Sequence, residues 1–136
     1  STCRGHTDYV FVVAAMPDGQ RILSGARDKT IRVWQLDGTL ENTFELHTNT
    51  ECSSLFALVA MPDNQHALTG LHDIKLFDVN DGAVLRTFAH HDAAGAVSAG
   101  LRWHAVYSLS LLPDGLRFVS VSNDGTARIA YHGLAP

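Results

Sequence analysis

A short phrase recurs three times along the chain and constrains its fold more than any other feature. Met16-Pro17-Asp18-Gly19 returns as Met61-Pro62-Asp63-Asn64 and as Leu112-Pro113-Asp114-Gly115, with the prolines 45 and 51 residues apart. Each proline is followed eleven residues later by an aspartate: Asp28, Asp73 and Asp124. A unit of this length, repeated in register, indicates a repeat architecture in which each unit buries its apolar face against its neighbours.

Each repeat has the pattern of short β-strands separated by turns. An apolar, β-prone run precedes every Pro-Asp turn, in which proline presets φ and glycine or asparagine accepts a positive φ. A second strand, a tight turn that holds the aspartate, a third strand and a glycine turn then follow. No segment shows a convincing helical period. The predicted strands cover residues 10–16, 21–25, 30–36 and 40–45 in repeat 1, residues 55–61, 66–70, 74–79 and 84–89 in repeat 2, and residues 106–112, 117–121 and 126–131 in repeat 3.

Four short antiparallel strands in about 45 residues form one blade of a β-propeller. We therefore predict an all-β chain of about three four-stranded antiparallel blades. Repeat 1 covers residues 5–46, repeat 2 covers 47–89, and repeat 3 covers 90–136 and lacks its last strand. Propellers close with ~4–8 blades, so we expect the chain to be part of a larger propeller. Further blades of the same chain, or a second copy, would close the ring.

Composition narrows the partners and the compartment. Ten basic residues against fourteen acidic ones give a net charge of -4, which provides no broad cationic surface for nucleic-acid phosphates. No apolar run approaches the ~18–20 residues of a membrane span. The two cysteines, Cys3 and Cys52, are interpreted as free thiols of a reducing compartment. We expect an intracellular, cytoplasmic protein, and the start without Met or a signal peptide suggests that the chain begins inside something longer or was trimmed.

Repeat 1 carries a recognisable set of motifs. Gly5-His6, Ser24-Gly25 and the run Asp28-Lys29-Thr30-Ile31-Arg32-Val33-Trp34 closely resemble the WD40 repeat family. In that family a histidine, a serine or threonine, an aspartate and a tryptophan form a hydrogen-bonded tetrad inside each blade. The resemblance implies that this structural tetrad is His6, Ser24, Asp28 and Trp34, with Gln35 in place of the aspartate of the Trp-Asp pair.

The other repeats depart from the family pattern. Repeat 2 keeps His47, Thr69 and Asp73, with Phe77 at the tryptophan position, and phenylalanine has no indole N–H to donate. Repeat 2 is also two residues short between Asp73 and Ile74, either as a natural trimming of an exposed turn or because residues are missing from the chain. Repeat 3 keeps His90 or His91, Ser120 and Asp124, with Ala130 where the tryptophan belongs. Its tetrad is expected to be the most degraded.

A catalytic and a metal-binding interpretation are both weaker than the structural one. His6, Ser24 and Asp28 contain the groups of a hydrolase triad, but the set recurs in each repeat at positions where it satisfies buried polar groups. His90-His91 beside Asp92 and His104 have no fixed ligand spacing and no neighbouring cysteine. We therefore expect no enzymatic activity, no metal and no cofactor.

The resemblance also implies where partners dock. In the WD40 family they bind around the central channel, through residues at the start of each inner strand and before the turn aspartate. Phe11, Phe56 and Tyr107 all lie six residues before the proline of their repeat, so they occupy equivalent radial positions, exposed or facing the core between blades. The positions implied are Tyr9, Phe11 and Arg27 in repeat 1, Ser54, Phe56 and His72 in repeat 2, and Ala105, Tyr107 and Asn123 in repeat 3.

These features lead to a functional hypothesis with two rivals. We expect an interaction scaffold or adaptor that presents a protein-binding surface to other proteins or to a multiprotein complex, without catalysis. One alternative is an architectural component of a large permanent assembly. The other is the accessory propeller of a longer multidomain protein, such as an enzyme.

Overall fold

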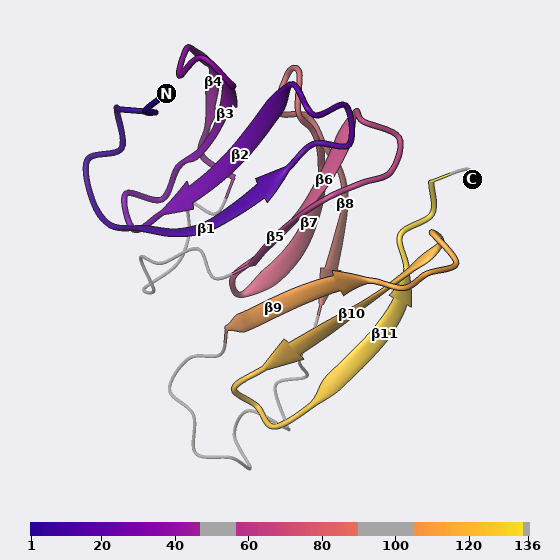
Figure 1. The fold of residues 1–136 in the computed structure, drawn as a ribbon. Coiled ribbons are helices and arrows are strands. Elements are labelled where there is room, and N and C mark those ends of the chain that lie inside the picture. The colour runs from indigo at the N-terminus through magenta and orange to yellow at the C-terminus, as the bar shows by residue number, and fades with distance from the viewer. Residues whose placement is uncertain (47–56, 90–104, 135–136) are drawn as a thin grey trace.

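The computed structural model describes residues 1–46, 57–89 and 105–134, and within them every regular element is a β-strand (Figure 1). Eleven strands form three antiparallel sheets of four, four and three strands, which confirms the all-β prediction. The sheets comprise β1 (Val10–Ala15), β2 (Arg21–Ala26), β3 (Ile31–Gln35) and β4 (Leu40–Phe44); β5 (Ala57–Ala60), β6 (His66–Gly70), β7 (Asp73–Asp78) and β8 (Val84–Ala89); and β9 (Val106–Leu111), β10 (Arg117–Ser122) and β11 (Ala127–Tyr131).

The second sheet differs from the sequence prediction at its central turn. The repeat pattern predicts Asp73 in a turn ahead of a strand at 74–79, but Asp73 is the first residue of β7 and pairs with Ala89. The physical reason is the shorter connection. In the first sheet the turn is longer, and the Ala26 N–H donates to the Thr30 carbonyl across it. Within this turn Lys29 adopts a φ of 68°. In the second sheet Leu71 N–H donates directly to the Asp73 carbonyl at 3.0 Å, so the strand begins earlier.

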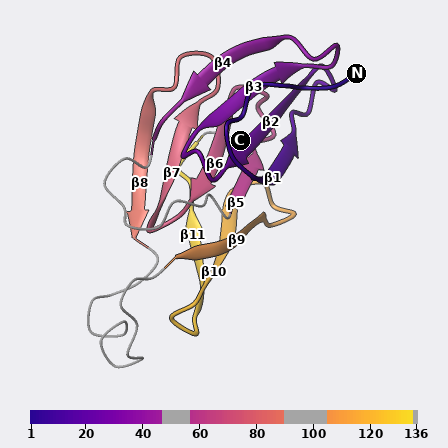
Figure 2. The ribbon, with the colours of Figure 1, turned by 90° about the vertical axis from the view of Figure 1, so that its left-hand side faces the viewer.

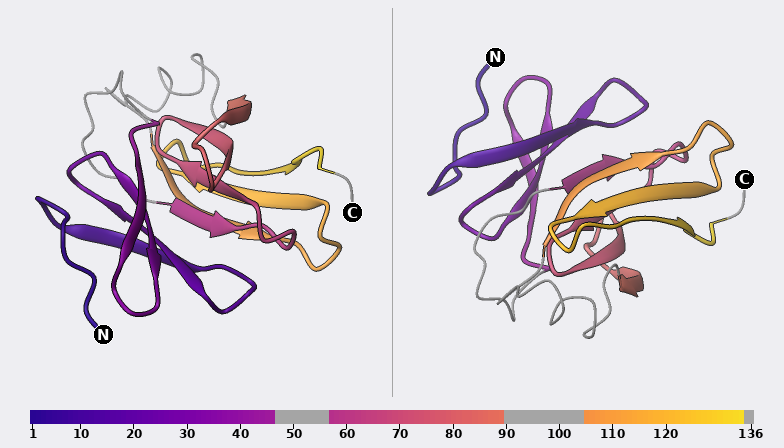
Figure 3. Two further views of the ribbon diagram at one scale, coloured as in Figure 1. Left: turned by 90° about the horizontal axis from the view of Figure 1, so that it is seen from above. Right: turned by 90° about the horizontal axis from the view of Figure 1, so that it is seen from below.

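The three sheets fan out from their first strands. Within each sheet neighbouring strands follow chain order. Between sheets, β5 lies beside both β1 and β9, while β4 and β8 lie at the far sides of their sheets (Figures 1 and 2). The views from above and below show the sheets turned relative to one another like successive blades (Figure 3). The first strands are therefore the inner strands of three adjacent propeller blades.

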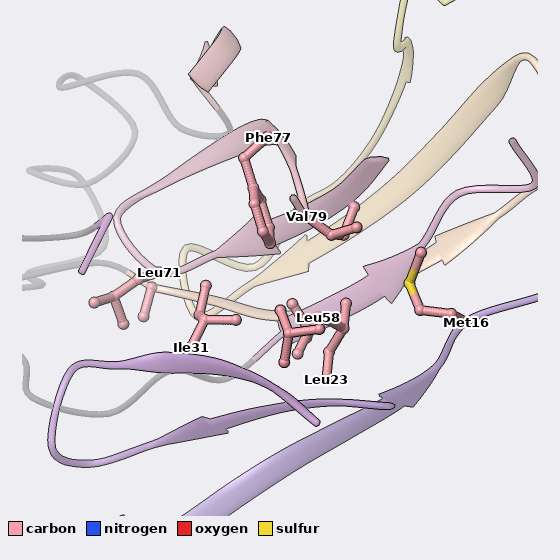
Figure 4. Packing of buried hydrophobic residues seen from close by; sticks show 10 residues of the cluster. Met16, Leu23, Ile31, Leu58, Leu71, Phe77 and Val79 are labelled. Atoms are coloured by element: carbon pink, nitrogen blue, oxygen red, sulfur yellow. The ribbon is translucent and has the colours of Figure 1, made fainter. Parts of the chain in front are cut away.

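Two apolar layers hold the blades together. The first lies between the first and second sheets, where Leu23 and Ile31 meet Leu58, Leu71 and Phe77 (Figure 4). The second lies between the second and third sheets and includes Met61, Leu76, Val106 and Phe118. The middle blade contributes to both layers, so all five residues of β6 are buried. Each such side chain stabilises the fold by roughly 1.5–3 kcal/mol on leaving water, which makes stacking the main source of stability.

The strand direction gives the stack two distinct edges. At one edge lie the turns after Pro17, Pro62 and Pro113, which we call the Pro-Asp edge. At the other, Arg27 N–H donates to the Tyr9 carbonyl at 2.7 Å, where the inner strand begins; we call this the entry edge. A strand of six residues separates the two edges by roughly 20 Å. Groups at the two edges therefore form separate sites.

Candidate functional site

The four residues of the expected tetrad in the first blade form one hydrogen-bonded chain. Trp34 Nε1–H donates to Ser24 Oγ at 2.8 Å, and Ser24 Oγ lies 2.6 Å from His6 Nε2. His6 Nδ1 lies 2.9 Å from Asp28 Oδ2. An ionised carboxylate only accepts, so Nδ1 carries a proton. In the neutral ring Nε2 is then the acceptor, and the Ser24 hydroxyl donates to it. The chain links the N-terminal segment to β2, β3 and the turn between them.

Asp28 is the anchor of this network. Its Oδ1 accepts the Thr30 hydroxyl at 2.6 Å and the Thr30 N–H at 3.0 Å, and its Oδ2 accepts the Thr7 N–H at 3.0 Å. Burial of the carboxyl raises its pKa, but the hydrogen bonds from Thr30, His6 and Thr7 outweigh burial and lower the pKa to about 2. The folded chain therefore strongly favours an ionised Asp28.

The equivalent residues in the other blades make different contacts among the described residues. In the second blade the Thr69 hydroxyl donates to the Ala57 carbonyl at 3.3 Å, and Asp73 Oδ2 lies 3.7 Å from Lys75 Nζ. Phe77 is fully buried and packs edge-on against Phe44 of the first blade. In the third blade Ser120 is buried, and Asp124 Oδ1 accepts the Thr126 hydroxyl at 2.6 Å. The predicted histidines His47, His90 and His91 lie outside the described residues.

The geometry of the tetrad also bears on catalysis. Ser24 is buried, and its oxygen accepts from Trp34 while its proton faces His6. A nucleophilic serine needs an exposed oxygen and a site for an oxyanion beside it, whereas this hydroxyl is enclosed by its partners. Within the described ranges no group of three or more His, Cys, Asp or Glu residues could hold a metal ion. His104, named above as a possible ligand, is among the residues not described.

The residues expected to bind partners lie at the entry edge in two blades. Tyr9 is exposed, its ring meets Phe11 edge-on with centroids 6.4 Å apart, and Arg27 Nε lies 4.0 Å from Asp8 Oδ2. The third blade repeats the backbone arrangement. Asn123 N–H donates to the Ala105 carbonyl, Ala105 N–H donates to Asn123 Oδ1 at 2.9 Å, and Ala105 is buried. His72 is half-buried beside the shortened turn, and Ser54 and Phe56 lie outside the described residues.

Phe11 and Tyr107 share a local backbone feature. The β1–β2 register shifts between Val10 and Val12, and the β9–β10 register shifts between Val121 and Ser122, opposite Tyr107. An extra residue of this kind is a β-bulge, which re-aims side chains out of the regular strand alternation. Because both residues lie at bulges, the alternation of side chains along a regular strand does not predict which face of the sheet the rings of Phe11 and Tyr107 occupy.

Equivalent positions in the first and third blades can be compared by the exposed fraction of their side chains. Val13 and Leu109 both lie four residues before their proline, yet Val13 is 67% exposed and Leu109, which packs on the preceding blade, is 8% exposed. Val13 is exposed because the first blade has no preceding blade in the structure. Phe11 and Tyr107 are both 49% exposed, although one blade has a neighbour only after it and the other only before it. Phe56, the equivalent residue of the blade that has a neighbour on each side, lies outside the described residues.

Sequence reasoning missed a set of polar residues at the Pro-Asp edge. The aspartate after each proline pairs with the cationic or titratable side chain three residues later, as Asp18 does with Arg21 and Asp63 with His66. Asp114 pairs with Arg117 in the same way. The repeated pattern Pro-Asp-x-x-(Arg or His) in the sequence was the available signal.

Known proteins share the motifs that build this geometry. A sequence profile described as WD40, "WD domain, G-beta repeat", matches residues 1–35 and 82–129, which is more than half of the chain. The first match ends just after Trp34, and the second runs from the turn before β8 into β11. No helix in the described residues is long and apolar enough to cross a membrane.

Several curated proteins are similar over parts of the chain. The WD repeat-containing protein srw1 of Schizosaccharomyces pombe is 49% identical over 35 residues, which are 26% of this chain and 6% of that protein. Ribosomal RNA-processing protein 9 of Saccharomyces cerevisiae is 26% identical over 102 residues, 73% of this chain and 18% of that protein. THO complex subunit 6 of Homo sapiens is 39% identical over 51 residues, 37% of this chain and 15% of that protein. The chain spans less than a fifth of the length of each.

Proposed function

This chain belongs to the WD40 repeat family, and from that premise we propose that it is a non-catalytic interaction scaffold that binds protein partners at the entry edge. The observation that carries the proposal is the matched exposure of Phe11 and Tyr107, two aromatic rings at equivalent bulges in blades with different neighbours. Aromatic and arginine side chains dominate the binding energy of protein interfaces. Tyr9 and Arg27 add one of each beside Phe11.

The names of relatives support the proposal that the partners are proteins within larger assemblies. One is named as a subunit of the THO complex, and others are named as ribosome biogenesis proteins. The acidic balance of this chain, with a net charge of -4, disfavours direct binding of nucleic acid. We therefore propose that the chain works inside a multiprotein complex, in a reducing intracellular compartment consistent with the exposed thiol of Cys3.

We also propose that the outer faces of the first and third blades pack against further blades. Val10 and Val13 on the first blade, and Ile129 on the third, are large apolar residues that are more than half exposed. Val33, at the position in the first blade equivalent to Ile129, is fully buried by the second blade. Propellers close with ~4–8 blades, and further blades would bury these faces in the same way.

The test is affinity capture with quantitative mass spectrometry on matched variants. A double variant, Phe11→Ala with Arg27→Glu, removes one ring and reverses one charge at the entry edge. We expect it to lower partner recovery by about tenfold or more, since interface hot spots cost about 2 kcal/mol or more. The control variant, Leu36→Ala with Glu41→Lys, truncates an exposed apolar side chain and reverses one charge away from that edge, and it should retain the partners. Equal recovery with the two variants would refute the proposed binding edge.

A further inference from the structure

The two seams between blades differ at the Pro-Asp edge. At the seam between the first and second blades, Asn64 reaches across to Asp18. Its Nδ2 donates to Asp18 Oδ2 at 2.8 Å, and its Oδ1 accepts the Asp18 N–H at 3.0 Å. The primary carboxamide therefore meets both the carboxylate and the backbone of the turn, as a donor and an acceptor together.

The next seam has the same aspartate but no such amide. Asp63 stands where Asp18 stands, and the residue opposite, equivalent to Asn64, is Gly115. Asp63 Oδ1 accepts the Gln65 N–H at 2.9 Å, just as Asp18 Oδ1 accepts the Gln20 N–H at 2.8 Å. The two turns therefore differ in the amide that covers the first one, and in the side chain paired with the aspartate, which is Arg21 in the first turn and His66 in the second.

The groups that Asn64 satisfies at Asp18 remain available at Asp63. Among the described residues, none accepts the Asp63 N–H, and the only side chain that donates to its Oδ2 is His66, at 2.6 Å. A carboxylate oxygen can accept a second donor. The side chain of Asp63 is 38% exposed, against 27% for Asp18.

A cavity lies beside Asp63 and Gly115 at the second seam. It has a volume of about 440 Å³, within the range of small-ligand pockets. Asp63 and Gly115 stand on its wall beside Met61, Pro62 and Leu134, which supply an apolar lining. His132 forms part of the same wall and is held in place, because its Nε2–H donates to the Gly115 carbonyl at 2.7 Å and its Nδ1 accepts the Leu134 N–H at 3.1 Å.

We propose that this cavity is a second binding site, which takes an asparagine or glutamine side chain of a partner protein in the way that Asp18 takes Asn64. The amide nitrogen of the incoming side chain would donate to Asp63 Oδ2 and its oxygen would accept the Asp63 N–H. Its aliphatic carbons would lie on Met61, Pro62 and Leu134. The second carboxylate of the lining, Asp114, is already paired with Arg117, so the cavity is not built as a simple cation site.

The chain itself supplies the blocking variant. Gly115 has φ 69° and an added Cβ would meet nothing within 4 Å, while Asn64 holds φ 61° at the equivalent position. Asparagine tolerates this conformation better than most residues. Gly115→Asn should therefore fold and place its own amide in the part of the cavity beside Asp63. Gly19→Asn is the matched control, because Gly19 has φ 67°, equally open surroundings and the equivalent position in the first blade, away from the cavity.

The experiment is an NMR titration of the ¹⁵N-labelled chain with N-acetyl-asparagine methylamide. We expect saturable shifts of the Asp63 and Gly115 amide signals with a Kd on the order of 1 mM, as befits so small a probe. The shifts should persist in Gly19→Asn and vanish in Gly115→Asn. In Asn64→Gly, which uncovers Asp18, the Asp18 amide should become a second responding signal.

Two further probes separate this proposal from its competitors. N-acetyl-aspartate methylamide has the same shape but an anionic group, and N-acetyl-lysine methylamide is cationic. Binding of the lysine probe without the asparagine probe would overturn the proposal in favour of a charge site. The proposal would also be overturned if the shifts persisted in Gly115→Asn. The same holds if the aspartate probe bound as tightly as the asparagine probe. The lack of any shift at Asp63 with all three probes would overturn it too.

Discussion

Replacement of Asp28 by asparagine tests the tetrad as a source of stability. The folded chain lowers the pKa of Asp28 from its ordinary 3.8 to about 2, and each pKa unit corresponds to about 1.4 kcal/mol. The ionised carboxylate therefore contributes about 2 kcal/mol to the free energy of unfolding at neutral pH. Solvent screens this contribution only weakly, because the side chain is 6% exposed.

The pH dependence of this contribution has a definite sign. The folded-state pKa lies below the unfolded one, so the contribution is fully present above about pH 4 and is lost as the pH falls through about 2. The asparagine side chain of the variant does not titrate. The difference in unfolding free energy between the wild type and Asp28→Asn should therefore narrow by about 1 kcal/mol between about pH 5 and about pH 3.

Urea unfolding followed by far-UV circular dichroism, repeated across this pH range, measures the difference. Asp8→Asn serves as the control for loss of one negative charge, since Asp8 is largely exposed and its nearest cation, Arg27, lies 4.0 Å away. The control should change the unfolding free energy by less than about 1 kcal/mol. A gap between the wild type and Asp28→Asn that stays constant with pH would refute the role assigned to the carboxylate.

Three other variants probe the same architecture. Trp34→Phe copies the natural residue of the second blade and should cost about 1–3 kcal/mol by thermal unfolding, because the donor to Ser24 is lost and a buried ring shrinks. Phe77→Ala should cost about 3–5 kcal/mol in the same assay, since Phe77 lies in the layer between two blades. Val13→Lys with Ile129→Lys should reduce self-association of the isolated chain in sedimentation velocity, because both residues are on open sheet faces. Unchanged association would argue against those faces as blade contacts.

Local sequence was sufficient to predict the strands. The Pro-Asp turns fix where each first hairpin closes, and alternation of turn residues with β-prone runs fixes nearly every strand to within one or two residues. The positions of His6, Ser24, Asp28 and Trp34 follow the family pattern, and the structure links their side chains by contacts of 2.6 to 2.9 Å. The one-residue departure at Asp73 falls in a turn that is two residues shorter than in the first repeat, and a shorter hairpin lets the strand start earlier.

What the sequence left open was decided by packing between units far apart in the chain. Burial of Leu109 and exposure of Val13 at equivalent positions depend only on whether a neighbouring blade is present, which no local pattern encodes. The orientation of Phe11 and Tyr107 depends on bulges set by strand pairing. The cavity beside Asp63 exists because Gly115 faces it across a seam, 52 positions further along the chain. Repeats specify their own hydrogen bonds locally, whereas surfaces and cavities arise from contacts that only stacking creates.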